Sequence, residues 1–442
     1  MRIPARVKQS YKDDSVHKYV KLHFPQLNLD ITNEQIYSES MSLSESLMDR
    51  STVEFVGCIS SCFKIKVHNL KEDVKGKRIV VTIWTEDTTD YPIKLFDGIV
   101  DSVVRDSNKR SKQITAYDKL YEKGNVDVAS WYQGLSFPIT LKNLRNSLFN
   151  YLGINQVGRD LPNDNITISK IYDPKTLQSL TVIKSICQIN GAMGIINRDG
   201  NFEYRIISDI TVIPYPSIAL FPSNKTFPAT ISSEQIEAEV VSYYRTVDFE
   251  DYEVQPVDKV KVRDNEEDVG VSYGTGNNAY IVQNNMFAKK LDDTTKTTIA
   301  HNIYDAIHGV TFTPFSSKNN GFPWIECGAD ALTCQVYNYD FDDTQPVSEQ
   351  NPMFINKEFY ILNREISGSQ ALVDQYTVKG DEYQSEFITD LNANVDMIKE
   401  SSNYDTGRID GIYNTFGGQE VMIVVDWNVS TGVLQTSSTI LS

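Results

Sequence analysis

The chain has 442 residues, of which 40% are hydrophobic and 23% charged, proportions that are ordinary for a folded protein with a water-exposed surface. Its 59 acidic residues outnumber its 42 basic ones, and the net charge of -17 disfavours a protein that reads nucleic acid or binds anionic lipid. No apolar run is long enough for a spanning helix, so we expect no membrane insertion by this chain. The N-terminus lacks the apolar segment of a secretory signal.

The first predicted strands surround a pair of cysteines. Residues 52–67, "TVEFVGCISSCFKIKV", alternate as strand, interruption and strand, and contain Cys58 and Cys62. No second close Cys or His pair completes a zinc set, so we expect packing thiols and no metal. The preceding segment, with Ser44 and Glu45, is predicted to be a connection with turn or cap contacts. No histidine is placed to activate a serine there.

All five cysteines are expected to be structural, because the set is odd and sparse in a long chain. They are Cys58, Cys62, Cys187, Cys327 and Cys334. Such a set argues against a disulfide framework.

Residues 18–118 are predicted to form mostly strands, in an antiparallel barrel or sandwich that includes a hairpin with its tip near Asn108. The pattern then changes. Residues 139–154, "ITLKNLRNSLFNYLGI", place Leu141, Leu144, Leu148, Tyr151 and Leu152 at helical spacing, with Gly153 as the stop.

A second helix is expected to begin at Asp173 and Pro174 and to end at Gly191. A hairpin that turns at "NRDGN" should follow it. Strands return over residues 235–290 and continue to about residue 380.

One helix interrupts these later strands, with Ile299, Ile303, Ala306 and Ile307 facing inward and Gly309 at its end. Residues 385–404 are predicted to be weakly helical, and the last 40 residues to be a short extended tail.

Two hairpin-like stretches resemble each other. Residues 98–118 and 360–381 each contain a strand with an arginine near its end, Arg105 or Arg364, then a loop and a second strand. The similarity predicts a duplicated unit.

Patterns that imitate catalytic sites lack their structural context. "GVSYG", residues 270–274, matches a nucleophile elbow, but no helical period follows Ser272, so we expect a turn. "GTGNNA", which begins at Gly274, lacks the helix of a dinucleotide site. His301 and His308 share a helix but are too far apart for a common metal. The pair Asp342–Asp343 lacks an EF-hand pattern and is expected to be a solvated loop.

The three other histidines, His17, His23 and His68, belong to no HExxH motif, and no carboxylate pair is selected for glycoside cleavage. We therefore expect no enzyme, and no catalytic, cofactor-binding or metal-binding residues.

Several stretches taken together resemble the hub proteins of phage tails, also called tail-associated or baseplate hub proteins, which recur in phage-derived bacteriocin particles. The resemblance covers roughly residues 30–385. It rests on "SESMSLSESL", "STVEFVGCISSCFKIKV", "KQITAYDKLY", "DVASWYQGL", "TLKNLRNSLFNYLGI", "ICQINGAMGIINRDGNFEY" and "ISGSQALVDQYTVKGDEYQ". It implies a mainly β protein with α+β insertions, in which two barrel-like tube domains carry smaller α+β domains.

The expected division follows from the resemblance and the pattern changes. Residues 1–121 would form the first β-barrel tube domain, which residues 202–235 could complete. Residues 122–201 would form an α+β domain with two helices. Residues 236–381 would form the second tube domain with one helix, and residues 382–442 a short C-terminal extension, too short for a typical catalytic domain.

The resemblance implies a structural role in a virion tail tip or phage-like particle made in the bacterial host cytoplasm. A homotrimeric ring would join the tail tube to the baseplate or fibre and bound the channel for DNA and the tape-measure protein. Its partners would be adjacent distal tail or tube proteins, and a tip or fibre protein at its C-terminal side. DNA would only pass through. The alternatives are a cell-wall hydrolase and a host-surface adhesin.

Overall fold

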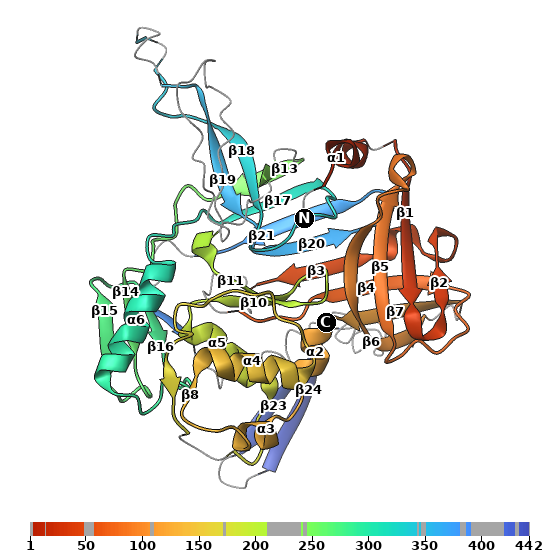
Figure 1. The fold of residues 1–442 in the computed structure, drawn as a ribbon. Helices are drawn as coiled ribbons and strands as arrows, with labels where there is room; N and C mark the ends of the chain where they lie inside the picture. Colours follow the sequence, from red (N-terminus) through yellow and green to blue (C-terminus); the bar gives the residue numbers. More distant parts are fainter. Residues whose placement is uncertain are drawn as a thin grey trace. The chain divides into compact units, whose positions relative to one another are not determined.

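The computed structural model describes residues 3–13, 15–47, 57–106, 110–170, 174–209, 240–241, 245–342, 344–345, 351–380, 386–389, 420–428 and 433–441 (Figure 1). The chain divides into two compact units, Met1–Leu391 and Asn392–Ser442. Strands predominate in both units, and helices are few. The expectation of a mainly β, multi-domain protein with α+β insertions is therefore confirmed.

An antiparallel sheet of eleven strands dominates the first unit, in the order β13-β17-β21-β20-β3-β4-β7-β6-β5-β1-β2. Its strands are β1 (Lys18–Phe24), β2 (Leu29–Ile31), β3 (Ser42–Ser46), β4 (Cys62–His68), β5 (Arg78–Thr85), β6 (Ile93–Arg105), β7 (Ser111–Tyr117), β13 (Thr246–Phe249), β17 (Phe315–Asn320), β20 (Asn363–Ser367) and β21 (Val373–Val378). Strand β3 pairs with β4 on one edge and with β20 on the other. Strands from both ends of the first unit's sequence thus share one sheet.

Alternation along the strands builds the core. In β4, Phe63, Ile65 and Val67 are fully buried and their neighbours are half-buried, as a period of two requires. Strand β3 follows the same rule and buries Leu43 and Glu45. The prediction that Glu45 lies in a connecting segment with turn or cap contacts is therefore wrong, because this segment pairs with strands on both sides.

The α+β part contains α2 (Lys119–Gly124), α3 (Ala129–Gln133), α4 (Leu141–Leu152), α5 (Ser179–Ile189), and the hairpin of β10 (Met193–Ile196) and β11 (Phe202–Arg205). The helix predicted at Leu141–Leu152 is confirmed. Thr140 accepts a hydrogen bond at its start, and Gly153 ends it in the left-handed region at φ 67°. Tyr151 is 53% exposed and does not join the buried face.

Helix α5 begins later than the sequence predicts, at Ser179 instead of Pro174. The cause is a short extended pairing just before it. The carboxylate of Asp127 accepts a hydrogen bond from the amide of Leu177 at 3.0 Å, and Asp127 bridges Gln178. Asp173 lies outside the described residues. The hairpin predicted after α5 is confirmed.

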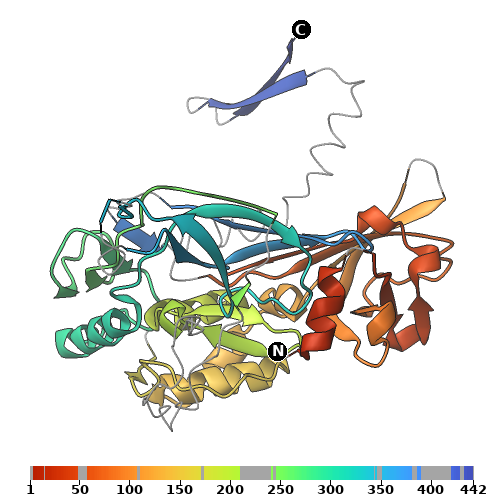
Figure 2. The same ribbon diagram turned by 90° about the horizontal axis from the view of Figure 1, so that it is seen from above.

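Two smaller sheets complete the first unit. One contains β12 (Val240–Val241), β18 (Ala331–Tyr337) and β19 (Phe354–Tyr360); the other contains β14 (Lys259–Val262), β15 (Val271–Gly274), β16 (Ala279–Val282) and β22 (Glu386–Thr389). The short strands β8 (Ile139–Thr140) and β9 (Thr167–Ile168) pair with each other. Viewed from above, α4 and α5 lie to one side of the large sheet (Figure 2).

The remaining helices are α1 (Ala5–Lys12) and α6 (Asp293–Ile307), with short 3-10 turns elsewhere. These are η1 (Pro25–Leu27), η2 (Asn33–Gln35), η3 (Ser38–Ser40), η4 (Glu86–Thr88) and η5 (Ile207–Asp209). The predicted late helix is confirmed as α6, which buries Ile299, Ile303 and Ile307. Across the ranges that the structure describes, no helix is both long and apolar enough to cross a membrane.

The weak helix predicted over residues 385–404 is wrong at its start, where Glu386–Thr389 pairs with β16 as a parallel strand. The rest of that segment lies outside the described residues. The described residues of the second unit form an antiparallel pair of strands, β23 (Glu420–Asn428) and β24 (Val433–Leu441). The predicted tail is thus extended, as expected, but paired with itself.

Asp118 ties the end of β7 to the segment that contains the cysteines. Its buried carboxylate accepts hydrogen bonds from the Ser60 hydroxyl at 2.7 Å and from the amides of Ser61 at 2.7 Å and Leu120 at 2.8 Å. Burial raises the pKa of Asp118 to about 6, against the effect of these donors. Four of the five cysteines are buried and Cys62 is half-buried.

The folded state raises this pKa, so it favours the protonated carboxyl of Asp118. The contribution of Asp118 to the free energy of unfolding is therefore greatest below about pH 4 and is lost as the pH rises through about 6. Between pH 4 and pH 8, the free energy of unfolding of the wild type should therefore fall by up to about 3 kcal/mol relative to Asp118→Asn. Urea unfolding at several pH values measures this. Exposed Asp251→Asn is the control, and an Asp118→Asn curve parallel to the wild type would contradict the assignment.

Candidate functional site

A buried ionic cluster lies where the two parts of the large sheet meet. Glu45, on β3, is 8% exposed. Its carboxylate accepts hydrogen bonds from Nη2 of Arg198, at 3.1 and 3.3 Å, and from Nη1 of Arg364, at 3.0 Å. Arg198 comes from the β10–β11 turn and Arg364 from β20. Three segments distant in sequence therefore meet on one carboxylate.

Arg364 is fully paired. It binds Asp374 on β21 in a bidentate manner, with Nε–Oδ1 at 2.7 Å and Nη2–Oδ2 at 2.9 Å. It also donates to the carbonyls of Phe322, at 2.7 Å, and Ile325. Asp374 accepts two more bonds, from the Tyr376 hydroxyl at 3.1 Å and the Phe322 amide at 2.9 Å. Such bidentate, charge-assisted pairs fix geometry closely.

Arg198 extends the cluster to the first part of the sheet. It donates to the carbonyl of Leu95, on β6, at 2.7 Å and to that of Ile325 at 2.9 Å. Arg205, on β11, binds the carboxylate of Glu326 at 2.7 Å and donates to the carbonyl of Cys327. The segment from residue 322 to 327 is thus held by three arginines.

The charges in the cluster stabilise one another. Burial by itself lowers the pKa of Arg364, but the carboxylates of Asp374 and Glu45 raise that pKa well above its ordinary value. Burial by itself raises the pKa of Glu326. The positive charges of Arg205 and Arg198 lower this pKa by more than burial raises it, so the net shift is downward. Burial also raises the pKa of the Cys327 thiol, which therefore stays protonated. This chemistry holds segments together and provides no thiolate nucleophile.

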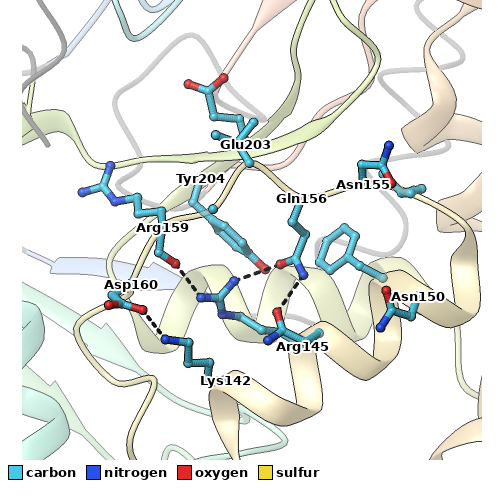
Figure 3. A pocket seen from close by; sticks show the side chains of 14 residues that line it. Lys142, Arg145, Asn150, Asn155, Gln156, Arg159, Asp160, Glu203 and Tyr204 are labelled. Atoms are coloured by element: carbon cyan, nitrogen blue, oxygen red, sulfur yellow. Dashed lines mark hydrogen bonds and ion pairs between the residues drawn. The ribbon is translucent and has the colours of Figure 1, made fainter. Parts of the chain in front are cut away.

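A separate cleft of about 1030 Å³ lies against α4 and β11 (Figure 3). Buried Arg145 binds Asp164 at 2.7 and 2.8 Å and donates to Gln156 at 3.0 Å and to the carbonyl of Arg159 at 2.6 Å. Its guanidinium lies 5.4 Å from the centre of the Tyr204 ring. These contacts already use the donors of Arg145 within the chain.

At the rim of the cleft, Lys142 pairs with Asp160, as Figure 3 shows. The remaining lining is rich in amides, among them Asn146, Asn150 and Asn155. The charges of the cleft are therefore mostly neutralised by partners in the same chain.

The structure places the residues of the two patterns that imitate catalytic or metal sites, the GVSYG motif with Ser272 and the pair His301 and His308. Ser272 lies within β15, paired with β14, so the predicted turn is wrong. A further strand, β16, follows it instead of a helix. His301 lies 3.3 Å from Asp305 and contacts the Tyr273 ring, whereas His308 stacks on Tyr304.

The predicted acidic loop is described only in part. Asp342 accepts hydrogen bonds from the amide and hydroxyl of Thr344 at 2.9 and 2.6 Å. Asp343 lies outside the described residues. Within the part of the chain that the structure describes, no group of three or more His, Cys, Asp or Glu residues could hold a metal ion.

The sequence contained a signal for Glu45 that was missed. Met41, Leu43 and Leu47 alternate with polar residues and are all buried, so Glu45 occupies an inward position of the same strand pattern. A carboxylate at such a position requires a buried cation. Nothing local identifies Arg198 and Arg364 as those cations.

No protein-family model matches the chain, and no curated protein matches it. Similar solved structures are the 43 kDa tail protein of prophage MuSo2 from Shewanella oneidensis (10% identity, 82% of this chain and 97% of that chain, TM-score 0.47) and the tail protein from Neisseria meningitidis MC58 (12%, 83% and 99%, 0.45). Prophage tail protein gp18 from Listeria monocytogenes EGD-e is a third (11%, 82% and 95%, 0.44). All three are tail proteins, the class that the sequence resembles.

Removing the Glu45 carboxylate leaves two arginines without their shared buried partner. We expect Glu45→Ala to lower the free energy of unfolding by about 3–5 kcal/mol, because uncompensated buried charge is costly. Glu45→Gln, which keeps the shape, should cost less. The exposed Glu250→Ala is the matched control and should change stability by less than about 0.5 kcal/mol. Equal urea midpoints for Glu45→Ala and Glu250→Ala would contradict this role.

Proposed function

We propose that the chain is a structural hub protein of a phage or phage-like tail tip and that it has no enzymatic activity. The observation that carries the proposal is the junction at β3. There, strands β1–β7 and strands β13, β17, β20 and β21 form one sheet, with the Glu45 cluster buried across it. A structural protein that transmits force needs such a rigid connection, because domains joined only by a linker would rotate relative to each other.

The two sets of strands are proposed to be two tube domains, within residues 1–121 and 236–381. The α+β domain would span residues 122–201, and residues 382–442 would be a C-terminal extension. The β10–β11 pairing supports placing Phe202–Arg205 beside the α+β domain, since β11 pairs there and not in the large sheet. The two stretches that resemble each other fold as the antiparallel hairpins β6–β7 and β20–β21, one in each set, which supports a duplication. Their arginines do not correspond, because Arg105 is exposed at the end of β6 whereas Arg364 is buried near the start of β20.

Three such chains would present six tube-like elements around a channel, which is what the family resemblance implies. Closed rotational symmetry is the usual arrangement of identical subunits. The ring would contact adjacent distal tail or tube proteins and a tip or fibre protein, and it would sit in the virion or phage-like particle. The tape-measure protein and DNA would pass through it. The net charge of -17 favours passage of DNA without binding.

The proposed assembly predicts a defined mass. Each chain weighs 50.1 kDa, so a trimer has a mass of about 150 kDa. Light scattering after size exclusion, or native mass spectrometry, measures it on the purified protein, and a reconstruction of assembled tails counts the copies. One copy per tail tip would contradict the proposed ring.

The structural role also predicts that the purified chain leaves peptidoglycan intact. A zymogram with a known muramidase as the positive control tests this directly. Clearing by the chain would favour a cell-wall hydrolase.

A further inference from the structure

Strands β18 and β19 form a ribbon that projects from the first unit (Figure 1). They pair over seven residues, from Ala331–Tyr360 to Tyr337–Phe354. Strand β12 pairs only with Ala331 and Leu332, at the inner end. Among the described residues, the outer part of the ribbon therefore has two strands. An isolated two-stranded ribbon is only marginally stable in water.

The outer end of this ribbon is apolar and exposed. It carries five of the eleven large apolar residues that are exposed in the described chain: Tyr337 (43%), Tyr339 (88%), Met353 (46%), Phe354 (53%) and Ile355 (43%). The Tyr337 ring contacts those of Tyr339 and Phe354, with centroids 5.6 and 6.2 Å apart. A concentration of this kind marks an interaction surface.

Both faces of the ribbon contribute to this surface. Tyr337 lies directly opposite Phe354, so these two residues share a face, and the next pair, Val336 and Ile355, lies on the other face. Apolar side chains are therefore available on either face of the ribbon end for contact with a partner.

The same end is acidic. Among the described residues at this end, Asp340 and Asp342 are acidic and exposed, and none is basic between Asn338 and Met353. The partner surface should therefore combine an apolar centre with basic side chains.

The chain itself carries such a surface at the end of the β6–β7 hairpin. The described residues there include the basic Arg105, Arg110 and Lys112 and the acidic Asp106, whose carboxylate lies 2.9 Å from the Lys66 ammonium. Arg105 lies opposite Lys112 in the strand pairing, and both Arg105 and Arg110 are exposed. Val104 is 61% exposed beside them.

The β18–β19 ribbon projects from one side of the first unit, and strands β6 and β7 lie on the opposite side (Figure 1). A contact between them must therefore join two copies of the chain. Because the surfaces differ, the contact runs head to tail, and contacts of this type form rings when the rotation closes.

We propose that the outer end of the β18–β19 ribbon of one copy docks on the basic end of the β6–β7 hairpin of the next copy. The inference rests on the proposed trimer and identifies its contact. Tyr337, Tyr339 and Phe354 supply aromatic anchors, and the aspartates face Arg105, Arg110 and Lys112 across the rim. Aromatic anchors inside a charged rim are the usual composition of strong protein interfaces.

A charge exchange tests the contact on the full-length chain. One variant carries Arg105→Glu and Arg110→Glu, a second carries Asp340→Lys and Asp342→Lys, and a third carries all four. At a concentration where the wild type has a mass of about 150 kDa, each two-site variant should fall to about 50 kDa, because like charges then face each other. The four-site variant should return to about 150 kDa, because opposite charges face each other again.

Three controls separate assembly from folding. Lys71→Glu with Lys75→Glu changes as many exposed charges elsewhere and should leave the trimer intact. Asp342→Asn keeps an acceptor for Thr344 and tests whether the loop turn matters. Tyr339→Ser removes a side chain that is 88% exposed, so it should weaken association at least about tenfold without changing the circular dichroism spectrum or thermal midpoint of the chain.

The outcomes are distinct. A trimeric wild type whose two-site and Tyr339→Ser variants all remain trimeric overturns the proposed contact but leaves the hub function standing. Loss of the trimer in both two-site variants without recovery in the four-site variant also overturns it, because the two ends then do not face each other. A wild type that is monomeric both in solution and in assembled tails overturns the contact and the ring together.

Discussion

The arrangement of the first unit depends on one carboxylate. Glu45 lies in the centre of the eleven-stranded sheet and is shared by Arg198 and Arg364, which belong to two other parts of the chain. A buried charge without a partner costs several kcal/mol, so neither arginine can move away without a large penalty. Hydrophobic contact alone tolerates sliding, whereas charge-assisted hydrogen bonds to a buried carboxylate have a fixed geometry. The cluster therefore fixes the relative position of the parts that hydrophobic burial brings together.

This constraint explains why the segment from Phe322 to Cys327 has an ordered path although it is not a helix or strand. Its carbonyls accept hydrogen bonds from Arg198, Arg205 and Arg364. The cluster is rich in donors because these carbonyls, as well as the carboxylates, need partners inside the protein. The centre of the unit is thus polar and densely hydrogen-bonded where the two parts of the sheet meet, with Nε of Arg198 as a buried donor that lacks a partner. The surfaces proposed for assembly lie at the ends of hairpins.

Local patterns predicted the parts of the fold that local forces determine. Helix α4 follows from the leucine spacing and Gly153, and β4 from the alternation of Phe63, Ile65 and Val67. The start of α5 was missed because Asp127, 50 residues away, holds Leu177 in an extended conformation. Ser272 was expected in a turn because its pairing with β14 has no local signature. The partners of Glu45 are 153 and 319 residues away, and a single sequence cannot reveal contacts at that separation.

Amide hydrogen exchange followed by mass spectrometry tests the central claim, that the two sets of strands form one rigid body through the Glu45 junction. If the claim holds, amides in β3, β4, β20 and β21 exchange only through global unfolding and share one slow rate, because opening either part exposes the buried charges. Fast exchange in β17, β20 and β21 while β4, β6 and β7 remain protected would show that the two parts open independently. That result would contradict the account.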